Sequence, residues 1–81
     1  MADDFRILVV DDEPTQRELV CGFLRKQGLE ATPAESGEQG LEVFRQQPFD
    51  LVLTDQKMPK LSGLDLLKSV RAINPETSVI V

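Results

Sequence analysis

Short apolar runs alternate with amphipathic segments along the whole chain. The apolar, β-favouring runs predict strands at residues 5–10, 29–34, 50–55 and 78–81. Segments with apolar residues at helical spacing predict helices at residues 15–27, from Ser36 to about 46–48, and at about 64–73. The resulting β-α-β-α-β-α-β order predicts one α/β domain, with a parallel sheet, right-handed crossovers and helices on both faces.

The first strand and the first helix carry the clearest core pattern. Four consecutive apolar residues at 7–10 predict a strand that is buried on both faces. Pro14 suits the first turn of the helix that follows. The apolar stripe of this helix consists of Leu19, Val20, Phe23 and Leu24. Cys21 lies beside this stripe, and we expect it to be a small packed hydrophobe.

Local signals mark where several elements begin and end. Gly28 suits the position just after the first helix. Pro33 favours an edge strand or a strand end, because it cannot donate a ladder hydrogen bond. Ser36 and Gln39 have the spacing of a capping box. The last predicted strand, 78–81, is hydrophobic and is expected to leave an exposed edge that favours association.

Composition narrows the possible functions. The net charge of −5 argues against binding of nucleic acid or of an anionic membrane surface by this domain. With no His and one Cys, a zinc site is disfavoured, and any catalytic histidine must come from a partner. The sequence has neither a signal-peptide pattern nor an apolar run of about 20 residues. A lone Cys fits a reducing cytoplasm, which is the predicted location.

Acidic residues follow two of the predicted strands. Asp11 and Asp12 come after the first strand and Asp55 ends the third, so all three are expected at the carboxyl edge of the sheet, where ligands bind in such folds. Clustered carboxylates repel one another and favour a hard divalent cation such as Mg²⁺. We therefore predict Asp11 and Asp12 as metal ligands and Asp55 as a phosphoryl acceptor. The alternative is that these acids are solvated turn residues near helix N-termini.

Two motifs and a glycine carry a family resemblance. They are Val9-Val10-Asp11-Asp12-Glu13, then Asp55-Gln56-Lys57-Met58-Pro59, then Gly63. In this order and spacing the chain resembles the receiver domain of bacterial two-component response regulators, across nearly its whole length. The residues Thr54-Asp55-Gln56-Lys57-Met58-Pro59 resemble most those of receivers attached to AAA+ transcription activators.

The resemblance implies a fold, a site and partners. The fold is the flavodoxin-like doubly wound parallel sheet, with strand order 2-1-3-4-5. Asp55 would be phosphorylated by a histidine kinase, and Mg²⁺ would be held by Asp11, Asp12, Asp55 and the backbone carbonyl of Lys57. Pro59 and Gly63 would belong to the loop after the phosphorylation site. The domain would be a phosphoryl-accepting signalling module that switches an output domain, not an enzyme beyond self-catalysed phosphorylation and dephosphorylation.

The resemblance also implies that residues 1–81 are the N-terminal two-thirds of a receiver. They would form the (βα)3β portion of a (βα)5 domain, truncated after the fourth strand and lacking the switch Ser/Thr and the Lys of the family. We accordingly expect this fragment to respond weakly to phosphate analogues and to form a homodimer or a segment-exchanged assembly.

Other functions remain open from the sequence. The main alternative is a non-phosphorylated pseudo-receiver that acts as a protein–protein interaction module. A phosphohydrolase is disfavoured, since no second acid stands two residues after Asp55. The residue there is Lys57, whose side chain is expected to be a solvated loop lysine.

Overall fold

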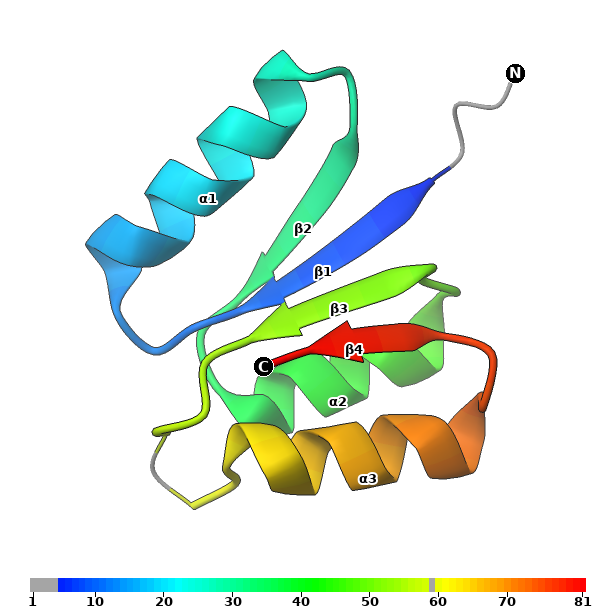
Figure 1. Ribbon diagram of the computed structural model, residues 1–81. Coiled ribbons are helices and arrows are strands. Elements are labelled where there is room, and N and C mark those ends of the chain that lie inside the picture. The colour runs from blue at the N-terminus through cyan, green and yellow to red at the C-terminus, as the bar shows by residue number, and fades with distance from the viewer. Residues whose placement is uncertain (1–4, 59) are drawn as a thin grey trace.

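The computed structural model describes residues 5–58 and 60–81, which form four strands and three helices in the predicted order (Figure 1). The elements are β1 Arg6–Val10, α1 Pro14–Lys26, β2 Glu30–Ala34, α2 Gly37–Gln46, β3 Leu51–Thr54, α3 Gly63–Ile73 and β4 Ser78–Ile80. All paired strands are parallel, and the sheet order is β2-β1-β3-β4. The predicted flavodoxin-like α/β fold is confirmed. Pro59 lies outside the described residues.

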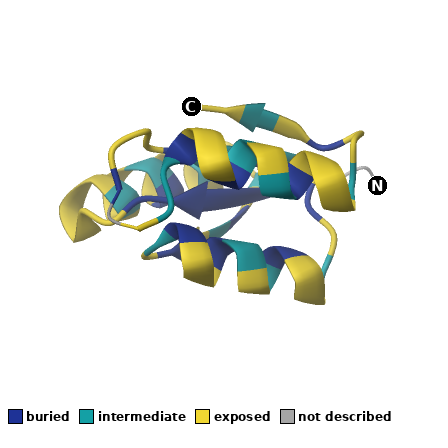
Figure 2. Cartoon of the chain, turned by 90° about the horizontal axis from the view of Figure 1, so that it is seen from below, coloured by how far each residue is buried: buried dark blue, intermediate teal, exposed yellow. Residues whose placement is uncertain are grey.

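The sheet is covered on both faces, as predicted. Helix α1 lies on one face and α2 and α3 on the other (Figure 1). Successive side chains of β1 point to opposite faces, so Leu8 and Val10 join the core under α2 and α3 while Ile7 and Val9 join the core under α1. All four are almost fully buried, and the central sheet lies between exposed outer helix surfaces (Figure 2). The apolar run at 7–10 was therefore interpreted correctly.

The predicted apolar stripe of α1 is only partly buried. Leu19 and Phe23 are 68% and 62% exposed, whereas Val20 and Leu24 pack beside the buried Cys21. Helix α1 packs against β1 and β2, and this places Cys21 toward the sheet and turns Leu19 and Phe23 onto the outer flank of the helix. Cys21 is thus a packed hydrophobe, as expected, and it lies at the centre of the buried face.

The termini of the elements differ slightly from the predicted ones. Strands β1, β2 and β3 are shorter than predicted. Asp50, which was predicted to begin the third strand, lies just before β3, and its carboxylate accepts a hydrogen bond from the Arg6 amide at 2.8 Å. Helix α1 begins at Pro14, after an N-cap at Glu13, and helix α3 begins at Gly63, after an N-cap at Ser62. Both caps accept a backbone N–H through their side chains, which satisfies amides that the first helical turn leaves unpaired.

The other local signals have clear structural counterparts. Gly28 has a φ of 83°, the left-handed conformation expected just after a helix. Pro33 lies in the edge strand β2. The Ser36 hydroxyl accepts the Gln39 amide at 3.0 Å, but the Gln39 side chain accepts the amide of Glu35 instead of that of Ser36. The second hydrogen bond of the capping box therefore goes to the amide one residue before the N-cap.

Strand β4 forms the second edge of the sheet. Its outer side has no partner strand within residues 5–58 and 60–81, and Ile80 and Val81 are more than half exposed. The exposed hydrophobic edge predicted for this segment is confirmed. Over the described part of the chain, no helix has the length and apolar character required to cross a bilayer.

Two helical glycines offer a matched test of the packing. A Cβ on Gly40 would lie 2.7 Å from Cγ2 of Val10, whereas one on Gly22 would meet nothing within 4 Å. We predict that Gly22→Ala stabilises the fold by up to about 1 kcal/mol through helix propensity. Gly40→Ala should destabilise it by about 1–3 kcal/mol, because α2 must move off β1. Urea unfolding followed by circular dichroism measures both, and equal stability of the two variants would contradict this packing.

Candidate metal centre

The site begins where β1 and β3 end side by side. Val10 pairs with Thr54 in the parallel register, and one more hydrogen bond follows, from the Asp55 amide to the Val10 carbonyl at 3.2 Å. The Asp11 amide in turn donates to the Ala34 carbonyl at 3.1 Å, which ties the same point to β2. Asp11 and Asp55 are thus held at the carboxyl edge by extensions of the sheet, as their sequence positions indicated.

The three predicted carboxylates meet at this edge. Asp11, Asp12 and Asp55 each offer a carboxylate oxygen, and these oxygens all lie within 4.8 Å of one another. Asp11 is 8% exposed, whereas Asp12 and Asp55 are open to solvent. The cluster therefore has one anchored carboxylate and two accessible ones.

The turn after β1 is shaped by its own acidic side chains. The Asp11 carboxylate accepts the amide of Glu13 at 3.0 Å, and the Glu13 carboxylate accepts the amide of Gln16 at 3.0 Å. These bonds start α1 immediately after the turn and fix the direction in which Asp11 leaves the strand. Asp12, between them, points its carboxylate into the same cluster.

The loop after Asp55 folds back onto the start of α3. The side-chain oxygen of Gln56 accepts the amide of Leu64 at 2.9 Å. The backbone carbonyl of Gln56 accepts the amide of Gly63 at 3.2 Å. A Cβ on Gly63 would lie 2.6 Å from the Asp55 carbonyl, so no side chain fits there. Gly63, singled out in the sequence, is required by this close approach of two backbones.

The donor set suits a hard divalent cation. Three carboxylate oxygens within 4.8 Å, two of them on exposed residues, can contribute ligands and leave room for water and phosphate oxygens. Lys57, two residues after Asp55, is exposed in the loop. The role of its backbone carbonyl as a ligand stays a prediction, as do the metal-binding roles of the three aspartates.

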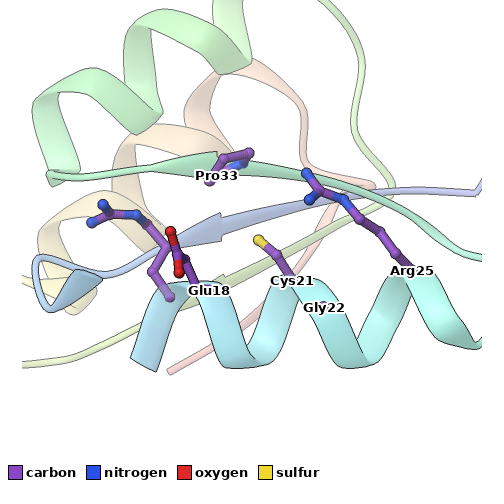
Figure 3. A pocket seen from close by; sticks show the side chains of 6 residues that line it. Glu18, Cys21, Gly22, Arg25 and Pro33 are labelled. Atoms are coloured by element: carbon purple, nitrogen blue, oxygen red, sulfur yellow. The ribbon is translucent and has the colours of Figure 1, made fainter. Parts of the chain in front are cut away.

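A cleft lies beside α1, away from the three carboxylates. It has a volume of about 410 Å³ and lies between α1 and β2 (Figure 3). Its lining consists of Arg17, Glu18, Cys21, Gly22, Arg25 and Pro33. Burial raises the pKa of the Cys21 thiol, and the charges of Arg25 and Arg17 oppose this only in part. The thiol is therefore protonated near neutral pH, as a packing residue would be.

Sequence reasoning missed two residues that shape the site. Gln56 closes the loop after Asp55 through its side chain, and Arg17 donates to the backbone carbonyl of Asp11 at 2.8 Å. Gln56 carries no distinctive sequence signal. Arg17 does, because a cation near a helix N-terminus opposes the helix dipole and needs another explanation.

Comparison with known proteins identifies the family. Residues 7–81 match the response regulator receiver domain, and the chain belongs to this family. It is 40% identical over 79 residues to the transcriptional regulatory protein ZraR of Escherichia coli, covering 98% of this chain and 18% of ZraR. It is also 40% identical over 78 residues to a probable chemotaxis protein CheY of Rhizobium etli, covering 95% and 60%. The chain thus spans less than two-thirds of either relative.

Solved structures agree with the sequence relatives. The response regulator protein TrrA of Thermotoga maritima, in complex with Mg²⁺ and BeF, superposes with a TM-score of 0.90 at 42% identity. The match covers 95% of this chain and 67% of TrrA. A response regulator receiver domain protein from Clostridium thermocellum has a TM-score of 0.89 at 40% identity, with 93% and 61% covered. The family predicted from the motifs is confirmed.

Proposed function

We propose that this chain is a phosphoacceptor receiver in which Asp55 takes a phosphoryl group from a histidine kinase. The observation that carries the proposal is the meeting of Asp11, Asp12 and Asp55 within 4.8 Å at the carboxyl edge of the sheet. Family membership and the Mg²⁺–BeF complex of TrrA support it. The relatives include both transcriptional regulators and chemotaxis proteins, so the family alone does not select the output.

Each residue of the site has a distinct role in this proposal. A carboxylate oxygen of Asp55 attacks the phosphorus of a phosphohistidine, a P–O bond forms, and the P–N bond breaks with its electron pair left on the imidazole. Asp11 and Asp12 would hold Mg²⁺ together with Asp55 and the Lys57 carbonyl. When bound, Mg²⁺ shields negative charge between the carboxylates and the phosphoryl oxygens. The imidazole comes from the kinase, since the 81 residues contain no His.

The proposed output rests on the transcriptional regulators among the relatives. ZraR is a transcriptional regulatory protein and this chain matches 18% of it, so we propose that the domain switches an output domain that regulates transcription. Attachment to an AAA+ activator stays a prediction, as does the cytoplasmic location. Residues 1–81 would be the N-terminal part of a receiver domain. The domain would act as a signalling module and not as a turnover enzyme.

Beryllofluoride with Mg²⁺ tests the phosphoacceptor role, since it mimics the phosphoryl group on Asp. In a longer protein that extends residues 1–81 to a full receiver, we predict a shift of the Asp55 amide in a nuclear magnetic resonance spectrum, with a weak response in residues 1–81 alone. Asp55→Asn should abolish the shift. Glu42→Gln, which removes an exposed charge on α2, should preserve it. No shift in the longer protein would favour the pseudo-receiver, an interaction module without phosphorylation.

We also propose that residues 1–81 alone self-associate through the outer edge of β4, as a homodimer or a segment-exchanged assembly. An unpaired strand presents backbone N–H and C=O groups that a second strand can pair with. The exposed side chains of Ile80 and Val81 would be covered in that contact. The outer flank of α1, with Leu19 and Phe23, is a second apolar surface on the same molecule.

Light scattering at about 100 μM, where weak association becomes visible, tests this assembly. We expect a mass above the 9.0 kDa of the monomer. Ile80→Lys should restore the monomer mass if β4 is the contact, because a charge on an edge strand opposes pairing. Leu19→Lys, on α1, tests the second apolar surface, and loss of the assembly in that variant alone would contradict a contact through β4. A monomer mass for the unmodified chain would contradict the proposal.

A further inference from the structure

Arg17 makes an unusual contact for a residue near the start of a helix. It belongs to α1, and its amide donates to the Glu13 carbonyl at 3.0 Å, which is an ordinary helical bond. Its guanidinium folds back over the turn, and Nη1 donates to the carbonyl oxygen of Asp11 at 2.8 Å. One side chain thereby connects the body of α1 to the residue at the end of β1.

Asp11 is held from three directions. Its amide donates to Ala34 at 3.1 Å and its carboxylate accepts the Glu13 amide at 3.0 Å. The bond from Arg17 satisfies its carbonyl, which lies past the end of β1 at a part-buried position. Because the donor is charged, this bond is stronger than one between neutral groups. Without it, the peptide between Asp11 and Asp12 could rotate and change how the carboxylates of these two residues face each other.

The position of Arg17 is otherwise unfavourable. The helix dipole disfavours a cation near an N-terminus, and a positive charge bonded to the backbone of a metal-site residue opposes cation binding by like-charge repulsion. The guanidinium bonds to a neutral carbonyl, and the carboxylate oxygens of Asp11 are not used in that bond. An orientating role accounts for both features.

We propose that Arg17 is a positioning residue that fixes the backbone of Asp11 so that its carboxylate faces those of Asp12 and Asp55 for a divalent cation. This inference rests on the proposed function, because it concerns the same metal site. The positioning role predicts that loss of Arg17 changes the Mg²⁺ affinity in the opposite direction to loss of its charge alone. Loss of a nearby positive charge strengthens cation binding, whereas loss of a positioning bond weakens it.

Arg25 provides a matched control on the same helix. Its Nη2 donates to the carbonyl of Ala31 at 2.9 Å, and its side chain extends from α1 toward β2 (Figure 3). The bond is of the same kind, but it holds the start of β2, far along the strand from the carboxyl edge. Arg17→Met and Arg25→Met therefore remove the same charge and the same type of bond, and only the first touches the site.

The test is a Mg²⁺ titration of the wild type and the variants, followed by the amide signals of Asp12 and Asp55, with urea unfolding measured in parallel. We expect Arg17→Met to weaken Mg²⁺ binding by about 10-fold or more, as loss of an outer-shell contact to a metal site does. Arg25→Met should keep the wild-type affinity even where its stability falls. Arg17→Lys, which keeps the charge and one donor, should lie between and covers the case in which Arg17→Met does not fold.

The outcomes separate this inference from the proposed function. Equal or tighter Mg²⁺ binding by Arg17→Met would overturn the positioning role, and tighter binding would show that Arg17 acts only as a charge. Equal weakening by both Met variants would also overturn it, since the effect would then be general. If the wild type binds no Mg²⁺ at all, both the inference and the metal site fail together.

Discussion

The parallel pairing of β1 with β3 is the interaction on which the site depends. Their register runs from Ile7 opposite Leu51 to Val10 opposite Thr54, and the Asp55 amide extends it by one bond to the Val10 carbonyl. A slip by one residue would turn the side chains of a strand to the opposite face. Burial of β1 on both faces opposes that slip, because Leu8 and Val10 fit one core and Ile7 and Val9 the other. Core packing therefore sets the distance between the carboxylates.

That arrangement has a cost, because three like charges are gathered at one edge. The fold holds them there with hydrogen bonds to the backbone around them and with one bond from the Glu13 amide to the Asp11 carboxylate. Backbone and side-chain hydrogen bonds fix Asp11 in the turn after β1, and the contact of Gly63 with Asp55 fixes the loop after β3. A site preorganised in this way is complementary to a cation before the cation arrives. In the proposed function, binding of Mg²⁺ relieves the repulsion.

Much of the fold and the outline of the site could be predicted from the sequence, for physical reasons. The run at 7–10 indicated a strand buried on both faces, and two strands ending in acid at one edge indicated that Asp11 and Asp55 lie together, as they do in the structure. Periodicity shows which residues share a helix face, but not how far a neighbouring element covers it, so the exposure of Leu19 and Phe23 could not be read from the stripe. Gln56 and Arg17 bond to backbone atoms across turns, and the geometry of those turns is not encoded in spacing.

We propose that Asp11, Asp12 and Asp55 form one divalent-cation site. Substitution of Mn²⁺ for Mg²⁺ tests it most directly, because a paramagnetic ion broadens amide signals according to their distance from it. We predict that the amide signals of the turn after β1 and of the loop after β3 are lost first. In the double variant Asp12→Asn and Asp55→Asn, these signals should no longer be broadened before the others. Broadening spread evenly over the acidic surface, or unchanged in that double variant, would contradict a site at the carboxyl edge of the sheet.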